Sequence, residues 1–197
     1  RSFLNDQQNI DIPADIDWKK FNRLAEINSV SGIIGYVFQQ ADADGVPAEI
    51  RRKYENDFLS TITITTMRDE SMKLLIDLLN KNGIDHLLFK GYIVKDLYTV
   101  PELRTYGDID FAIRRESRGK CNAMMLKNGY CPLADWEPVY SYEKNNEHYE
   151  IHTELLDSNL NNNADYQGYF RDFWKHTGNV DQHTYTPDPE YHLLYLL

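Results

Sequence analysis

The stretch Tyr106-Gly-Asp-Ile-Asp-Phe111 decides the fold, because acidic and apolar residues alternate along it. On an extended strand successive side chains point to opposite faces, so Asp108 and Asp110 share one face while Ile109 and Phe111 share the other. Two neighbouring carboxylates repel each other unless a cation lies between them, and hard ions such as Mg²⁺ take carboxylate oxygens. The stretch therefore predicts a strand with a candidate metal-binding face, although an edge strand facing water would show the same pattern.

A second stretch, Tyr149-Glu-Ile-His-Thr-Glu154, repeats this alternation. Glu150, His152 and Glu154 would share one face, and the apolar residues between them the other. A third carboxylate beside an aspartate pair is what a two-metal phosphoryl- or nucleotidyl-transfer site needs, because it helps to hold two cations about 4 Å apart. We interpret Glu150 as this third ligand and Glu154 as the solvent-facing side of a hairpin.

A third stretch, Leu88-Phe-Lys-Gly-Tyr92, places Lys90 and Gly91 where a predicted buried strand, Ile84–Phe89, enters a helix. A glycine at such a turn lets backbone N–H groups approach a triphosphate, and the N-terminus of the following helix favours anions. Lys90 and Arg104 carry the positive charge to reach phosphate groups. These residues are the candidates for nucleotide binding.

Around these stretches the hydrophobic spacing predicts helices and a mixed sheet. The β-branched run Thr61–Thr66 favours a strand by local propensity, but it lies between helical patterns and we expect a helix. Gly32 and Gly35 are expected to punctuate the stretch that follows the first helix. In chain order the expected elements are a helix after Asp17, a helix from Pro47 toward Met67, a helix over Met72–Leu79, strands Ile84–Phe89 and Asp108–Ile113, a helix over Ser117–Asn128, and a hairpin of Val139–Lys144 and His148–Leu155. This order describes an α/β or α+β domain behind a helical region.

Three segments follow from this pattern. They are a helical N-terminal region at 1–83, an α/β core at 84–156, and a loop with a C-terminal helical region at 157–197. The Asn-rich stretch 157–165 is expected to be a surface loop. The chain opens without Met and closes inside an apolar helical run, which predicts a piece of a longer protein.

Composition excludes several classes of protein. Lys and Arg number 21 against 31 Asp and Glu, for a formal net charge of −10, which argues against a nucleic-acid binder held by phosphate neutralisation. No stretch approaches the roughly 18 uninterrupted apolar residues of a membrane span. Cys121 and Cys131 do not form a disulfide framework, so we expect free thiols in a reducing, cytoplasmic setting.

Six short motifs in a fixed order carry a family resemblance. They are Phe89-Lys-Gly91, Asp96-Leu-Tyr98, Pro101-Glu-Leu-Arg104, Gly107-Asp-Ile-Asp-Phe111, Asn128-Gly-Tyr130 and His148-Tyr-Glu-Ile-His152. In this order they resemble the uncharacterised nucleotidyltransferase family of the polymerase-β-like superfamily. The resemblance is close from Leu88 to about Leu155 and looser toward both ends.

This resemblance implies an α+β fold, in which a helical N-terminal region precedes a minimal nucleotidyltransferase mixed β-sheet with helices packed on it. It implies that Gly91 takes the family's glycine position, that Asp108 and Asp110 form the metal-binding pair, and that Glu150 is the third carboxylate. The usual Gly-Ser turn is here Gly91-Tyr92, so the serine hydroxyl that would contact a phosphate is missing. Lys90 or Arg104 would have to supply that contact.

The leading hypothesis is a Mg²⁺-dependent nucleotidyltransferase that uses two ions and an NTP. Asp108 and Asp110 would hold the metals, and Glu150, helped by His152, would assist deprotonation of a hydroxyl on an unidentified small-molecule or protein acceptor. One alternative is a catalytically degenerate nucleotide-binding or interaction module, which the missing serine permits. Another is an Asp-x-Asp glycosyltransferase, which would place its motif after a longer nucleotide-binding unit than the one preceding Asp108.

Overall fold

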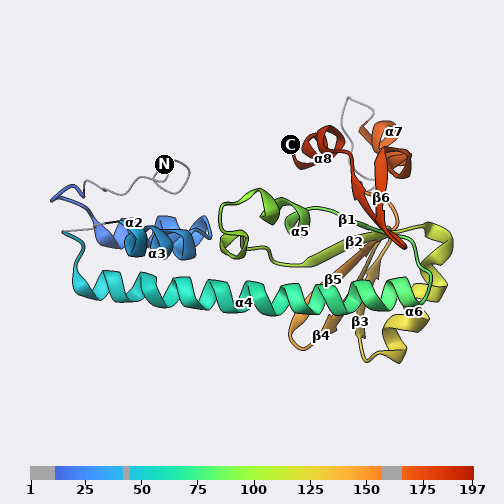
Figure 1. Ribbon diagram of the computed structural model, residues 1–197, viewed down its shortest axis with the longest axis horizontal. Coiled ribbons are helices and arrows are strands. Elements are labelled where there is room, and N and C mark those ends of the chain that lie inside the picture. Colours follow the sequence, from blue (N-terminus) through green and yellow to red (C-terminus); the bar gives the residue numbers. More distant parts are fainter. Residues whose placement is uncertain (1–11, 42–44, 157–165) are drawn as a thin grey trace. The chain divides into compact units, whose positions relative to one another are not determined.

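The computed structural model describes three stretches of the chain, residues 12–41, 45–156 and 166–197. They form two units, of which the first extends to Met67 and takes in Val100–Thr105, and the second comprises Arg68–Thr99 and Tyr106–Leu197. Helix α4 (Ala48–Lys81) contributes residues to both units (Figure 1). None of the helices in the described stretches is long and apolar enough to cross a membrane.

The first unit is helical around one buried tyrosine. It contains α2 (Trp18–Ile27), α3 (Ser31–Gln40) and the N-terminal part of α4. Asp17, after which the sequence predicts a helix, caps α2 by accepting a hydrogen bond from the Lys20 N–H at 3.1 Å. Tyr54 on α4 is fully buried, and its hydroxyl donates to the Asn22 side chain at 2.8 Å. One polar contact thus satisfies the hydroxyl inside an otherwise apolar cluster.

Gly32 and Gly35 lie inside α3 and do not interrupt it, so that expectation is wrong. Both are buried where α3 packs on α4. A Cβ at Gly32 would overlap the Thr61 side chain, and one at Gly35 would lie 2.8 Å from the Cβ of Phe58. The glycines are present because the two helix backbones approach too closely for any larger side chain.

The two helices predicted before and after Met67 form the single 34-residue helix α4, because no glycine or proline separates them. The run Thr61–Thr66 is helical as expected. The hydroxyls of Thr61 and Thr63 donate to carbonyls one turn earlier, each at 2.8 Å. These bonds keep the polar groups satisfied within the helix.

The described residues of the second unit form one sheet with the strand order β3-β4-β5-β2-β1-β7-β6. The strands are β1 (His86–Leu88), β2 (Ile109–Ile113), β3 (Cys131–Trp136), β4 (Val139–Lys144), β5 (Glu147–His152), β6 (Thr177–Asp181) and β7 (Thr184–Pro187). Strand β2 runs parallel to β5 and antiparallel to β1, while β1 runs parallel to β7. The other neighbours are antiparallel, so the predicted mixed sheet and α+β class are confirmed.

The hairpin between β4 and β5 is the one that the sequence predicts. Asn145 and Asn146 form its turn with φ angles of 54° and 63°. Two consecutive residues in the left-handed region make the turn whose twist matches the flanking strands, and Asn tolerates that region well. The turn fixes the register in which β5 presents its side chains.

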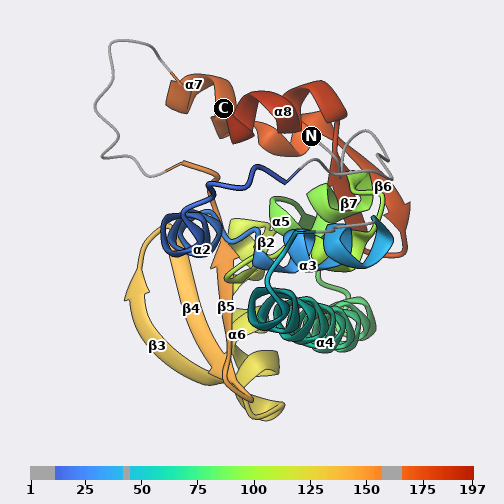
Figure 2. The same cartoon turned by 90° about the vertical axis from the view of Figure 1, so that its left-hand side faces the viewer.

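One face of the sheet packs on α4 and on α6 (Arg118–Lys127), with Ile109, Phe111 and Ile151 from β2 and β5 in its core. The other face buries Leu87 and Ala112 beneath three C-terminal elements. These elements are α7 (Tyr166–Arg171), the 3₁₀ helix η4 (Phe173–His176) and α8 (Pro189–Leu196). Figure 2 shows α7 and α8 on the side of the sheet away from α4.

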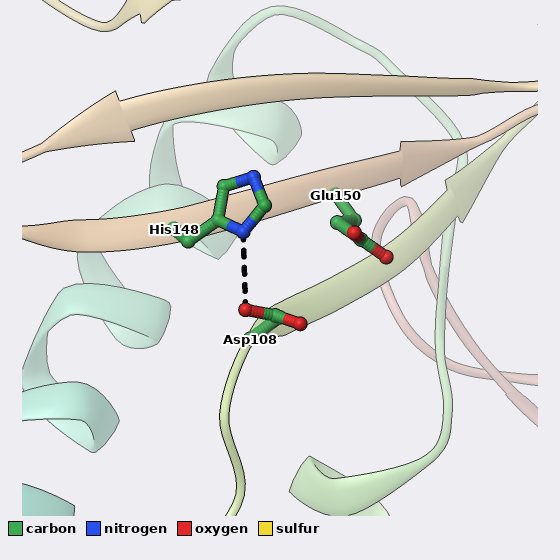
Figure 3. Close-up of side chains that lie close together, drawn as sticks. All are labelled: Asp108, His148 and Glu150. Atoms are coloured by element: carbon green, nitrogen blue, oxygen red, sulfur yellow. Dashed lines mark hydrogen bonds and ion pairs between the residues drawn. The ribbon is translucent and has the colours of Figure 1, made fainter. Parts of the chain in front are cut away.

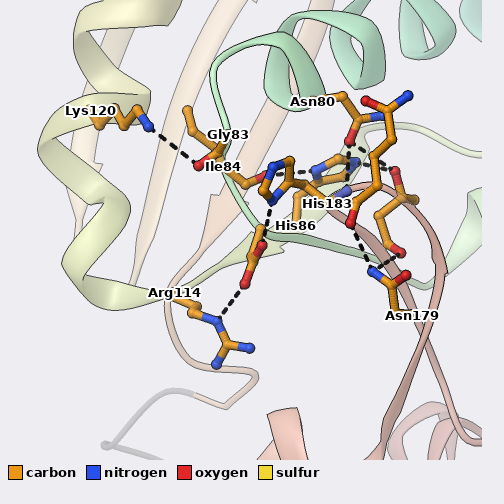
Figure 4. A network of polar contacts seen from close by, with 11 residues as sticks. Asn80, Gly83, Ile84, His86, Arg114, Lys120, Asn179 and His183 are labelled. Carbon is orange, nitrogen blue, oxygen red and sulfur yellow. Dashed lines mark hydrogen bonds and ion pairs between the residues drawn. The ribbon is translucent and has the colours of Figure 1, made fainter.

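Strands β3, β6 and β7 were not predicted, and β7 extends the sheet beside β1. A polar network ties β7 to β1 and to the end of α4 (Figure 4). The buried His86 ring contacts the Thr184 hydroxyl at 3.1 Å, and Asn80 accepts from the His183 N–H at 3.1 Å. Asp85 contacts the His183 ring at 2.8 Å.

The stretch 157–165, predicted to be a loop, lies outside the described residues.

Candidate metal and active site

Strands β2 and β5 place their polar side chains in register on one face of the sheet. Asp110 is paired with Glu150, and Ala112 with His152. Because the strands are parallel neighbours, residues directly opposite each other point the same way, and the next residues along alternate. Asp108, which immediately precedes β2, accordingly lies beside His148 at the start of β5.

Asp108, His148 and Glu150 form the more open part of this cluster. The Nδ1 atom of His148 lies 3.1 Å from Oδ1 of Asp108, and both side chains are partly exposed. Figure 3 shows the Glu150 carboxylate on the same side of the strands as this pair. One donor atom from each of the three side chains fits within a 4.8 Å span.

Asp110 forms the more enclosed part of the cluster, with its side chain only 11% exposed. Its Oδ1 atom accepts from Lys90 Nζ at 2.6 Å and lies 3.0 Å from Nε2 of His152. Burial alone would raise the pKa of the Asp110 carboxyl, but the hydrogen bonds and charges of His152 and Lys90 outweigh it and hold that pKa below its ordinary value. Asp110 is therefore a carboxylate at neutral pH.

His152 lies between two carboxylates. Its Nε2 atom faces Asp110 and also Oε2 of Glu150, the latter at 3.6 Å. Its side chain is 6% exposed, and the Phe89 ring packs edge-on against it at 5.1 Å between centroids. The other ring nitrogen, Nδ1, is buried and has no hydrogen-bond partner among the described residues.

Helix α4 fixes the turn that leads into Asp108. The Arg68 guanidinium donates to the carbonyl oxygen of Tyr106, and the Tyr106 hydroxyl donates to Asp69 at 3.1 Å. Gly91, which opens the short helix α5 (Gly91–Val94), packs against the same tyrosine, because a Cβ there would lie 2.6 Å from the Cβ of Tyr106. In the structure, Gly91 allows the Tyr106 side chain to pack closely against the backbone. Its contact with a nucleotide stays a prediction.

Two residues near Lys90 escaped sequence reasoning because both come from α8. His192 accepts a hydrogen bond from the Lys90 backbone N–H at 3.0 Å, and burial lowers the pKa of the His192 imidazole, which keeps it a neutral acceptor. Lys90 itself has a φ of 54°, which few non-glycine residues adopt. Tyr195 packs on Phe89 at 5.6 Å, and burial, with the charges of the cluster, raises the pKa of its hydroxyl.

Two further residues singled out in the sequence have other partners. Arg104 belongs to the first unit, where its guanidinium donates to the carbonyl of Thr105, and its binding to phosphate stays a prediction. Glu154 follows the end of β5 and pairs with Arg115 at 3.2 Å on the exposed surface. Its contact is the kind expected of a solvent-facing residue.

The donor atoms present fit divalent cations. Asp108, His148 and Glu150 form one group of three, and Asp110, Glu150 and His152 form a second, so Glu150 is shared between them. Carboxylate oxygens are ligands of hard divalent ions, and one bridging carboxylate is an arrangement suited to holding two ions close together. The sequence predicted the three carboxylates, but His148 was not among the predicted ligands.

A family model of uncharacterised nucleotidyltransferases matches residues 14–197, which is nearly the whole chain. The chain belongs to this family. Comparison with curated proteins gives no match. Among solved structures, the antibiotic-resistance factor ANT(2'')-Ia is similar at 13% identity and a TM-score of 0.43, over 59% of this chain and 60% of that one.

Family membership confirms the resemblance drawn from the six motifs. It assigns the chain to the nucleotidyltransferases in general and leaves the donor, the acceptor and the metal open. Tyr92, at the position where the resemblance led us to expect a serine, packs against the core on the α4 face, and burial raises the pKa of its hydroxyl.

Proposed function

We propose that the chain transfers a nucleoside monophosphate from an NTP to a hydroxyl group on a small-molecule or protein acceptor. The observation that carries the proposal is the convergence of Asp108, Asp110 and Glu150 on one face of β2 and β5. Membership of a nucleotidyltransferase family supports it. The net charge of −10 favours an acceptor other than nucleic acid.

Asp108, Asp110 and Glu150 are the proposed ligands of two divalent ions, with Mg²⁺ as the expected metal. Bound there, such ions would neutralise the triphosphate and stabilise the attacking and leaving oxygens. The chain's own contribution is to fix the carboxylates in register before the substrate arrives, so that little reorganisation is needed. The enclosed position of Asp110 and its lowered pKa support this role, because they keep it ionised.

Glu150 is the proposed base. It would accept the proton of the acceptor hydroxyl as that oxygen bonds to the α-phosphorus, while the bond from the α-phosphorus to the pyrophosphate oxygen breaks and pyrophosphate leaves. His152, whose Nε2 atom lies 3.6 Å from Oε2 of Glu150, is proposed to assist Glu150. Lys90 is the proposed phosphate contact in place of the missing serine, and its ammonium lies 2.6 Å from Oδ1 of Asp110. Arg104 and Gly91 are proposed as further nucleotide contacts.

The proposal is tested by pairing binding with turnover. Isothermal titration with each NTP and Mg²⁺ measures binding, and release of pyrophosphate in the presence of hydroxyl-bearing acceptors, such as sugars, aminoglycosides and serine-rich peptides, measures transfer. The Asp108→Asn/Asp110→Asn double variant should lose metal-dependent binding. Binding to the unsubstituted chain without pyrophosphate release from any acceptor would favour the degenerate nucleotide-binding module instead.

A further inference from the structure

Each half of the acidic cluster contains an imidazole that the proposed nucleotidyl transfer does not require as a ligand. His148 lies 3.1 Å from Asp108, and His152 lies 3.0 Å from Asp110. These contacts place one ring nitrogen in each group of potential ligands, and the two groups share Glu150. The cluster is therefore a mixed nitrogen and oxygen donor set.

The spacing of these donors matches a coordination shell. Neighbouring ligands of an octahedral ion with bonds of about 2.1 Å lie about 3.0 Å apart. A hydrogen bond to one carboxylate accounts for each short contact, and Oε2 of Glu150 lies 3.6 Å from the same His152 nitrogen, so two carboxylates are near one ring nitrogen. A cation between the three groups would be ligated by all of them.

The charge of the cluster also calls for cations. It holds three carboxylates. Among the described residues, the one ion pair between them and a lysine or arginine is that of Asp110 with Lys90. His152 is almost fully buried, and its Nδ1 atom has no hydrogen-bond partner among the described residues. The polar contacts of its ring are therefore made through Nε2, on the side of the carboxylates. Buried polar atoms without a partner are uncommon in folded proteins, and a role in binding or catalysis is one reason for them.

We propose that His148 and His152 are metal ligands, one for each of two cation positions that share Glu150, and that the centre binds Mn²⁺ more tightly than Mg²⁺. The inference rests on the proposed function only in taking this cluster as the catalytic metal centre. Mg²⁺ keeps oxygen ligands and water, whereas first-row transition ions also accept imidazole. Carboxylates alone would bind either ion, so the histidines give the transition ion its advantage.

Lys90 gives the two positions an order. Its ammonium lies 2.6 Å from Oδ1 of Asp110, so a divalent ion entering beside His152 must first displace it. The position formed by Asp108, His148 and Glu150 has no such ammonium among the described residues and fills first. Nucleotide phosphates that draw Lys90 away from Asp110 would leave this second position free for a cation.

The test is pulsed electron paramagnetic resonance of Mn²⁺ bound to the purified chain, without nucleotide. A ligating imidazole couples its nitrogen nucleus to the manganese spin and modulates the echo decay. We expect that modulation in the unsubstituted chain and its loss in His148→Asn, together with a roughly tenfold weaker Mn²⁺ affinity and a nearly unchanged Mg²⁺ affinity. The matched control is His183→Asn, because His183 contacts an aspartate at 2.8 Å without being grouped with a third ligand.

Three results would overturn the inference. They are Mn²⁺ bound without nitrogen modulation, equal loss of Mn²⁺ and Mg²⁺ affinity in His148→Asn, and no bound Mn²⁺ in the folded chain. The unsubstituted chain alone decides the first and third of these, so a variant that folds poorly does not obscure them. Nitrogen modulation without any transfer of nucleotide would contradict the proposed function and support the ligands, whereas transfer by an all-oxygen centre would do the reverse.

Discussion

Replacing Lys90 by Gln should destabilise the chain and also make it respond more strongly to divalent cations. The Lys90 and Asp110 side chains are 29% and 11% exposed, so this ion pair lies between a buried and a surface pair. Breaking a fully buried pair costs about 3–5 kcal/mol, and an exposed one contributes about 0–1 kcal/mol. Because His152 remains beside Asp110, we expect a loss of about 1–2 kcal/mol in the free energy of unfolding.

The assay is thermal unfolding with and without saturating Mn²⁺. For a chain of this size the loss corresponds to a melting temperature lower by about 2–8 °C. Lys175→Gln is the matched control, because Lys175 pairs with Asp172 at the same 2.6 Å distance on the exposed surface, and it should melt close to the unsubstituted chain. Added Mn²⁺ should narrow the gap for Lys90→Gln, because the ion takes the place of the lost ammonium. Equal melting of the two variants, or a gap that the ion leaves unchanged, would refute this reasoning.

Three further predictions follow from single contacts. Glu150→Gln should abolish nucleotidyl transfer in the pyrophosphate assay, whereas Glu154→Gln, an identical change on the exposed surface, should leave it intact. Equal loss of transfer in both variants would contradict the proposed role of Glu150. Gly91→Ala should destabilise the chain by about 1–3 kcal/mol in denaturant unfolding, because its new methyl group meets Tyr106, and a neutral effect would show that the tyrosine gives way easily. Burial raises the pKa of the Asp85 carboxyl, but its hydrogen bonds to a histidine and an arginine outweigh burial and lower that pKa. The ionised carboxylate therefore stabilises the fold above the pKa of the unfolded chain, and this stabilisation is lost as pH falls below about 4. Asp85→Asn should flatten the acid side of the curve of unfolding free energy against pH, and an unchanged curve would contradict this.

Elements with strong periodicity could be predicted from the sequence, and weak ones could not. The alternating hairpin and the apolar stripes of α4 appear where their spacing placed them. Gly32 and Gly35 were misinterpreted because glycine signals both a break and a close helix contact, and only the partner helix distinguishes the two. Strands β6 and β7 lack a buried face of their own, so their pairing depends on β1, which lies far away in sequence.

The candidate site was predictable as far as local alternation reaches. The period of two placed Asp108 with Asp110, and Glu150 with His152, on single faces. That these faces join depends on the parallel register of β2 and β5, which no single strand encodes. His148 continues the same alternation one step earlier and could have been found, whereas His192 could not, because nothing in α8 signals its bond to a backbone 102 residues away.

The position of β7 beside β1 constrains how this chain is made on the ribosome. Strand β7, the partner of the second edge of β1, is synthesised well after β1, and the contacting side chains of His86 and Thr184 are 98 positions apart. During that interval an apolar strand keeps one edge unpaired, which is a surface that chaperones or other nascent chains can occupy. The same delay applies to the turn at Lys90, whose backbone lacks its imidazole acceptor until α8 has been synthesised.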